Sequence, residues 1–202
     1  MTTKWRPAPF ELGFITQTFR NSADNDYIAA RLLYCNGLDQ QFLWSAEQAV
    51  EKYLKAILLY NGINTADIGH LLTRAFDRLD AITDIQFDLP DDTRDFLEYL
   101  QVYGTNRYLQ HPSFTAGEEL LRLDKTVWHI RRYCDYLRGE IKNSKGQRVD
   151  LLPAQLRRIL NPRTLAQPHR FRIMHGQLER VLGDQKSSLR PQARIRTASR
   201  SI

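Results

Sequence analysis

One stretch of the sequence, QQFLWSAEQAVEKYLKAILLYNG at residues 40–62, constrains the fold more than any other part of the chain. Apolar side chains recur in it every three or four positions, which places them on one face of an α-helix. This stripe consists of Leu43, Ala46, Val50, Tyr53 or Leu54, and Ile57. Gly62 stands where a left-handed C-terminal cap would end the helix. The stretch therefore predicts a long amphipathic helix that must bury its apolar stripe against other elements.

The same periodicity appears in four further segments, at residues 10–36, 70–82, 93–109 and 115–142. In the first of them the polar run NSADND interrupts the apolar stripe, so this segment is either one bent helix or two short ones. No segment shows the alternating pattern of a half-buried strand. We therefore predict an all-α fold, a bundle of four to five helices with short connections over residues 10–142.

Residues 143–202 differ from this body in composition and form a predicted basic extension. Residues 1–140 contain 15 Lys and Arg against 20 Asp and Glu (15 − 20 = −5), whereas residues 141–202 contain 14 against 3 (14 − 3 = +11). We expect the extension to be partly helical and its end, QKSSLRPQARIRTASRSI, to be disordered for lack of apolar content. Such a tail either binds RNA or DNA through phosphates, or solubilises the chain, or docks on the acidic body. Its segment 168–182 is also amphipathic enough to touch an anionic membrane.

The chain lacks the marks of a membrane or secreted protein. Its longest purely apolar run, residues 56–60, is far shorter than the roughly 18 residues that a membrane-spanning helix needs. The N-terminal residues contain no apolar stretch of the length of a secretory signal. Cys35 and Cys134 fall within helical apolar patterns and are expected to be reduced core thiols. These features predict a cytoplasmic protein.

Several of these pieces together resemble the HEPN family, whose name abbreviates "higher eukaryotes and prokaryotes nucleotide-binding". The resemblance covers about residues 10–140 and includes DYIAARLLYCNGL, GHLLTRAFDRL and NRYLQ before the last long helix. Its most specific part is the motif on the second helix, formed by Ala46, Gln48, Ala49, Glu51, Lys52, Leu54, Lys55 and Ala56. The resemblance implies an up-and-down helical bundle that commonly pairs as a homodimer.

The resemblance also implies one of two functions. In one branch of the family the domain is a metal-independent RNase, often the toxin of a toxin–antitoxin pair, with an arginine and a histidine at the junction of its last two helices. In the other branch the domain binds RNA, nucleotide or a protein partner, often a nucleotidyltransferase encoded beside it. Neither branch implies a cofactor or a bound metal ion.

Arg107 and His111 stand at the junction where the RNase branch has its catalytic pair. A metal-free RNase needs a base for the 2′-hydroxyl proton and a cation for the phosphate, which histidine and arginine supply. Only three residues separate the two here, one fewer than in the family motif, and Pro112 biases His111 out of the helical region. In the structural alternative, Arg107 binds a carboxylate or carbonyls at a helix end and His111 is a solvated turn residue. This departure favours the binding branch.

Four residues are candidates for ligand binding under this interpretation: Glu51, Lys52, His70 and Tyr108. Glu51 and Lys52 lie on the charged face of the second helix, and His70 begins the third, where it either caps helix ends or contacts ligand. His129, His169 and His175 share no ligand spacing with a cysteine or with one another, so no metal site is predicted. We predict a binding module for RNA, nucleotide or a protein partner such as a nucleotidyltransferase or antitoxin. The alternative is an endoribonuclease that uses Arg107 and His111.

Overall fold

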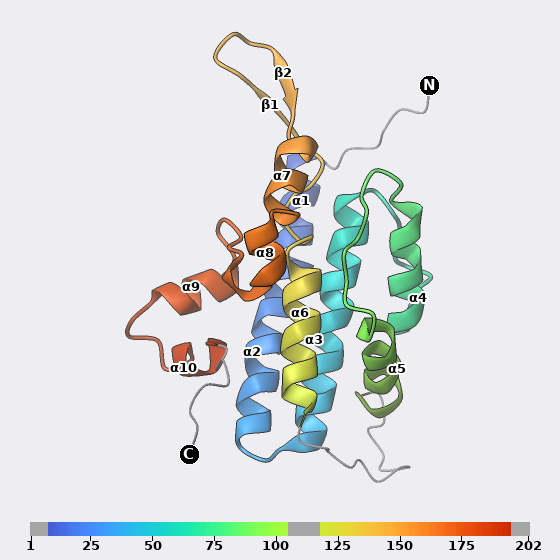
Figure 1. Ribbon diagram of the computed structural model, residues 1–202, viewed down its shortest axis with the longest axis vertical. Helices are drawn as coiled ribbons and strands as arrows, with labels where there is room; N and C mark the ends of the chain where they lie inside the picture. The colour runs from blue at the N-terminus through green and yellow to red at the C-terminus, as the bar shows by residue number, and fades with distance from the viewer. Residues whose placement is uncertain (1–7, 105–117, 195–202) are drawn as a thin grey trace.

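The computed structural model describes residues 8–104 and 118–194, and it confirms the predicted all-α fold (Figure 1). Residues 1–7, 105–117 and 195–202 lie outside the described residues, and with them Arg107, Tyr108 and His111. Within the described ranges, no helix combines the length and the apolar character needed to cross a bilayer.

The first part of the chain forms one long, continuous helical rod. Helix α1 (Pro9–Ile15) runs into a π-helical segment (Thr16–Asn21) and then into α2 (Ser22–Cys35), with helical backbone angles at both joints. The polar run NSADND thus lies inside this rod rather than between two helices. Its residues Asn21 and Asp24 are buried and form hydrogen bonds with polar partners, so the run belongs to the packed interior of the rod.

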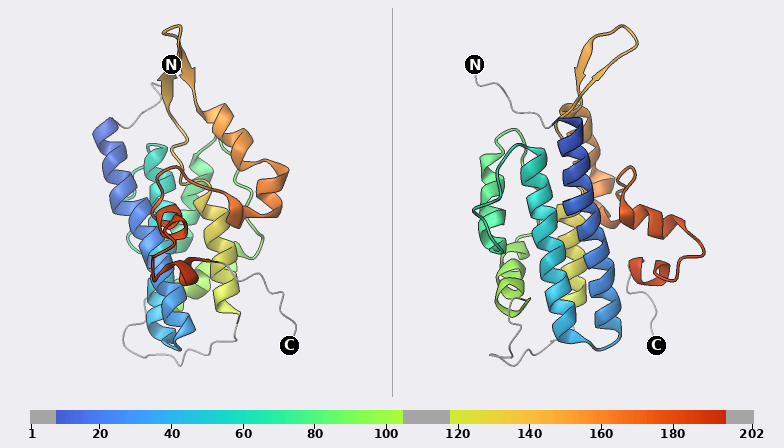
Figure 2. Two further views of the ribbon diagram at one scale, coloured as in Figure 1. Left: turned by 90° about the vertical axis from the view of Figure 1, so that its left-hand side faces the viewer. Right: turned by 180° about the vertical axis from the view of Figure 1, so that it is seen from behind.

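Helix α3 (Asp39–Tyr60) runs antiparallel to this rod and forms the centre of the bundle (Figure 2). The turn between them contains Gly37, whose φ of 70° only glycine adopts at little cost. The predicted apolar stripe of α3 is confirmed, since each of its members is at most 1% exposed. Helix α4 (Leu72–Asp77), a 3₁₀ turn (Arg78–Ala81) and α5 (Thr93–Gly104) cover one side of α3.

The last bundle helix, α6 (Glu119–Arg131), ends well before Lys142, where the periodicity predicted its end. Cys134 and Leu137 still pack in the core, but from an irregular segment. The chain then forms a hairpin of β1 (Glu140–Lys142) and β2 (Arg148–Asp150), which pair antiparallel. The side chain of Asn143 accepts hydrogen bonds from the N–H groups of Lys145 and Gln147, and this local turn chemistry is not part of a hydrophobic pattern.

The extension beyond the hairpin consists of short helices that pack against the bundle. They are α7 (Leu152–Ile159), α8 (Pro162–Ala166), a 3₁₀ turn (Pro168–Arg170), α9 (Gln177–Gly183) and α10 (Arg190–Ala193). Figures 1 and 2 place them beside α2 and α6, on the side of the bundle away from α4 and α5. Apolar side chains of the extension, Ile159, Ile173 and Leu178 among them, are buried in the same core as the bundle.

The two cysteines lie in different surroundings and do not pair. Cys134 is buried as expected, and burial raises the pKa of its thiol. Cys35 is exposed at the end of α2, so the expectation that it is a core thiol is wrong. Its position matches the apolar face of α2, but it stands in the last turn of that helix, where its side chain is exposed.

Candidate functional site

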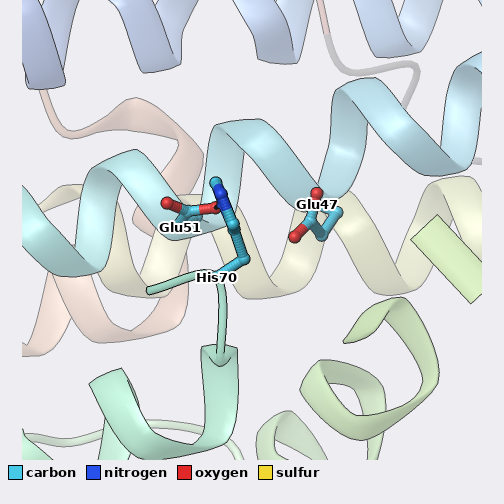
Figure 3. Close-up of side chains that lie close together, drawn as sticks. All are labelled: Glu47, Glu51 and His70. Atoms are coloured by element: carbon cyan, nitrogen blue, oxygen red, sulfur yellow. Dashed lines mark hydrogen bonds and ion pairs between the residues drawn. The ribbon is translucent and has the colours of Figure 1, made fainter. Parts of the chain in front are cut away.

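Helix α3 carries a charged cluster on the side that faces α4, and we call Glu47, Glu51, Lys55 and His70 the α3 cluster. Glu47, Glu51 and Lys55 follow one another at intervals of four residues, so they share one face of the helix. His70 comes from the turn before α4 and lies against the same face (Figure 3). Ligating atoms of Glu47, Glu51 and His70 all lie within 4.8 Å of one another. The sequence candidates Glu51 and His70 therefore meet in space.

The contact between Glu51 and His70 fixes the imidazole. Nδ1 of His70 lies 2.9 Å from Oε2 of Glu51, whose side chain is 7% exposed, whereas the His70 side chain is 72% exposed. A carboxylate at Nδ1 favours the tautomer with the proton on that nitrogen and leaves Nε2 for another partner. This pair presents an oriented ring nitrogen to the surroundings.

Lys55 neutralises the same carboxylate from the other side. Its Nζ lies 2.6 Å from Oε1 of Glu51 and donates to the carbonyl oxygen of Gly69 at 2.7 Å. Gly69 has a φ of 61°, a conformation suited to glycine, and directly precedes His70. Lys55 thus holds both the carboxylate and the turn that carries the histidine.

The α3 cluster has the donor types of a divalent-cation site, two carboxylates and an imidazole. The ammonium group of Lys55 already occupies one side of Glu51 and compensates its charge. The cluster is therefore an acid–imidazole site. The absence of a bound metal ion stays a prediction from the sequence.

The end of α5 lies directly on this cluster. A Cβ atom added at Gly104 would lie 2.7 Å from Cβ of Glu47 and 3.0 Å from the carbonyl oxygen of Leu43, so only glycine fits without a shift. The junction that carries Arg107, Tyr108 and His111 begins at the next residue and lies outside the described residues.

Lys52, the remaining sequence candidate, faces away from the α3 cluster. Its Nζ lies 2.5 Å from Oδ2 of Asp26 on α2, in a partly exposed ion pair. The sequence alone does not show whether Glu51 or Lys52 faces the cluster. Neighbouring residues on a helix point about 100° apart, so either of them can lie on the face that carries the cluster.

A second polar centre, deep in the molecule, joins the extension to the bundle. Asp24 of α2 is fully buried and accepts hydrogen bonds from Arg131 of α6, from the hydroxyl of Tyr53 and from the N–H of Leu178 in α9. The same Arg131 also binds Glu179 of α9, with Nη2 and Oε2 2.6 Å apart. These buried charges pair across the boundary between bundle and extension.

A similar pair lies further along α2. Arg31 forms an ion pair with Asp124 of α6 and donates to the carbonyl oxygens of Gln192 and Arg194. The hydroxyl of Tyr27 donates to Asp124 at 2.6 Å and receives the indole N–H of Trp128 at 3.0 Å. Sequence analysis missed both centres, although the polar interruption NSADND in an apolar stripe pointed to Asp24.

These surroundings shift the acids in opposite directions. Burial raises the pKa of Asp24, but the charge of Arg131 and the hydrogen bonds from Arg131, Tyr53 and Leu178 outweigh it, so the net pKa lies below its ordinary value. Burial raises the pKa of Asp124, and Arg31 offsets this only in part. Burial next to these carboxylates raises the pKa of Tyr53 and Tyr27.

The fold is an all-α bundle whose central helix carries an oriented acid–imidazole pair. Buried ion pairs hold a basic extension against this bundle. Together these features define a helical domain that presents charged groups. A scan against protein-family models matches the HEPN domain over residues 16–137, which is 122 of the 202 residues. The chain belongs to the HEPN domain family, as its resemblance predicted, and is a helical module of the nucleotide- and RNA-related class. No curated protein and no solved structure matches the chain. The family match ends before the hairpin and the extension.

Proposed function

We propose that this chain is a binding module that takes a nucleotide or a short single-stranded RNA at the α3 cluster. The observation that carries this proposal is the Glu51–His70 pair, in which a buried carboxylate orients an exposed imidazole. With the proton on Nδ1, Nε2 of such a ring accepts a hydrogen bond from a ribose hydroxyl or from an N–H group on a nucleobase edge. Glu51 and His70, which come from two separate parts of the sequence, meet there, next to the end of α5.

Membership of the HEPN family indicates a nucleotide or RNA as the ligand. The side chains of the α3 cluster indicate which part of such a ligand they contact. Two carboxylates disfavour close approach of a phosphate, whereas acidic side chains commonly bind ribose hydroxyls in nucleotide sites. A ligand with a ribose therefore fits this mixture of carboxylate and imidazole better than inorganic phosphate does.

Calorimetric titration of the full chain with ribonucleotides and a four-nucleotide RNA tests the proposal. We expect His70→Ala to weaken binding about tenfold, which corresponds to the loss of about one hydrogen bond. Lys52→Ala is the matched control, because Lys52 follows Glu51 in sequence but faces α2. Unchanged affinity in His70→Ala, or an equal loss in both variants, contradicts the proposal.

The alternative function, metal-independent RNA cleavage by Arg107 and His111, has one point in its favour. Arg107 and His111 stand where the RNase branch of the family has its arginine and histidine, three and seven positions after Gly104, which packs against Glu47. Cleavage of single-stranded RNA in the presence of a chelator, lost in both Arg107→Ala and His111→Ala, would establish this alternative and displace the binding proposal.

We further propose that the chain forms a homodimer and has a protein partner of the nucleotidyltransferase or antitoxin type. HEPN domains often dimerise, and one branch of the family often binds a nucleotidyltransferase, so family membership supports both proposals. Sedimentation analysis of the purified chain tests the first, and a single species of monomer mass at micromolar concentration contradicts it.

A further inference from the structure

The extension carries a groove between α8 and the 3₁₀ turn that follows it, with a volume of about 490 Å³. It is lined by Arg163, Thr164, Ala166, Gln167, Arg170 and Phe171. A second groove of about 270 Å³ is lined in part by His169, Arg172 and Arg194; it shares no lining residue with the first, but His169 and Arg172 flank Arg170 and Phe171 in the chain. We call these two together the arginine groove.

The arginines of this groove are exposed and carry uncompensated charge. Among the described residues, no carboxylate lies within ion-pair distance of Arg163, Arg170, Arg172 or Arg194. By contrast, Arg74, which is exposed, and Arg78, which is partly exposed, share Asp67 on the bundle. Over residues 143–194 the chain has 11 Lys and Arg against 3 Asp and Glu (11 − 3 = +8), so no local excess of acid balances the groove.

The groove is held in place by its contacts with the bundle. Arg158 binds Asp135 at 2.8 Å and lies over the ring of Phe171, 4.5 Å from its centre. The side chain of Asn161 caps the start of α8 by accepting from the N–H of Arg163 at 2.9 Å. Glu179, further along, is clamped by Arg131. A site fixed in this way loses little conformational entropy when a ligand binds.

We propose that the arginine groove binds the phosphodiester backbone of single-stranded nucleic acid. Guanidinium groups suit phosphate because they donate two parallel hydrogen bonds, and the side-chain amide of Gln167 suits sugar and phosphate oxygens. The ring of Phe171 is buried and covered by Arg158, so it offers no platform for base stacking. Recognition is therefore independent of base sequence.

This site goes beyond the function proposed for the α3 cluster and is spatially separate from it. The extension lies beside α2 and α6, whereas the α3 cluster faces α4 on the other side of the bundle (Figures 2 and 3). The two proposals can therefore fail separately.

Fluorescence anisotropy with labelled 12-nucleotide RNA and DNA of the same sequence, measured between 50 and 200 mM salt, tests the groove in the full chain. For single strands the slope of log K against log salt changes by about 0.7 for each phosphate neutralised. We expect Arg163→Gln/Arg170→Gln to weaken binding and to reduce the slope by about 1.4, which is two contacts at that value. Arg74→Gln/Arg78→Gln removes the same charge from the bundle and should leave the slope unchanged.

The outcomes separate the alternatives. Equal loss with RNA and DNA supports a backbone site, and loss with one of them supports the site and names its natural strand. An unchanged slope in Arg163→Gln/Arg170→Gln, the same change in the control variant, or binding of an acidic peptide but of neither nucleic acid overturns the proposal. His70→Ala should weaken the binding of mononucleotides without changing this slope, so failure at the α3 cluster is recognised independently.

Discussion

Asp24 is fully buried, and its carboxylate accepts four hydrogen bonds that come from three other parts of the chain. They come from Tyr53 at 2.7 Å, from Nε and Nη2 of Arg131 at 2.7 and 3.0 Å, and from the N–H of Leu178 at 2.8 Å. Removing one partner of a buried pair leaves the other charge without compensation, which costs far more than the pair itself contributes. Asp24 is thus the residue on which bundle and extension both depend.

We expect Asp24→Asn to lower the free energy of unfolding by about 3–5 kcal/mol, because Arg131 keeps its charge and loses its buried carboxylate. Chemical denaturation of both proteins measures this difference. Asp26→Asn, two residues away, removes a partly exposed pair with Lys52 and should cost less than about 1 kcal/mol. Equal losses in the two variants would show that the buried pair has no special weight.

The pH dependence of stability follows from the lowered pKa of Asp24. In acid the unfolded chain binds a proton at this residue before the folded chain does, so its contribution is fully present above the ordinary pKa of 3.8 and is lost as the pH falls through the lower folded value. We expect the stability difference between wild type and Asp24→Asn to be constant above about pH 5 and to shrink below about pH 4. Asp124, whose raised pKa acts with the opposite sign, is common to both proteins and cancels in this difference. A difference that grows toward low pH would contradict the assignment.

At the scale of the helices, the contact of α5 with α3 depends on Gly104. Its replacement by alanine would place a methyl group 2.7 Å from Cβ of Glu47, beside the α3 cluster. We expect Gly104→Ala to cost about 1–3 kcal/mol, as overpacking does, and thermal denaturation measures the loss. Gly13 in α1 has nothing within 4 Å of an added Cβ, so Gly13→Ala should stabilise by about 0.5–1 kcal/mol. Stabilisation by both substitutions would mean that α5 does not approach α3 closely.

The sequence predicted the helices of the bundle where one apolar stripe faces one core. The stripe of α3 is the clearest example, and the family motif lies on the same helix. The end of α6 and the hairpin were not predicted, because apolar spacing does not record where Cys134 and Leu137 leave the helix while they stay buried. Periodicity detects which side chains are buried, and it does not distinguish a helical backbone from an irregular one that buries the same residues.

The candidate site was predicted only in part, for a related reason. The candidates Glu51 and His70 meet, yet Glu47 and Lys55 of the same cluster were not selected, and Lys52 turns to α2. A charged helix face has the same pattern in sequence whether it meets solvent, a neighbouring helix or a ligand. Only the turn at Gly69, which is set by long-range contacts, brings His70 to this face rather than to another.

In the whole molecule, the acidic bundle and the basic extension, which differ in charge along the sequence, also lie in different parts of the structure. Buried ion pairs connect these two parts. The sequence alone is compatible with three roles for the basic extension: a tail that binds polyanions, a solubilising segment or a segment docked on the body. The structure docks it up to Arg194 through Asp24, Arg31 and Arg131, whose charges are buried with their partners. Exposed arginines remain on the outer side, so docking leaves them available for the nucleic-acid binding that we propose.

Native-state hydrogen exchange of the full chain tests most directly whether bundle and extension form one folding unit. Amides of α9, whose Leu178 N–H donates to Asp24, are predicted to exchange only through the same global opening as the amides of α3. The two sets should then show equal opening free energies and respond equally to denaturant. Fast exchange in α9 while α3 stays protected would contradict this account, because a loosely attached extension could not hold the arginine groove in place.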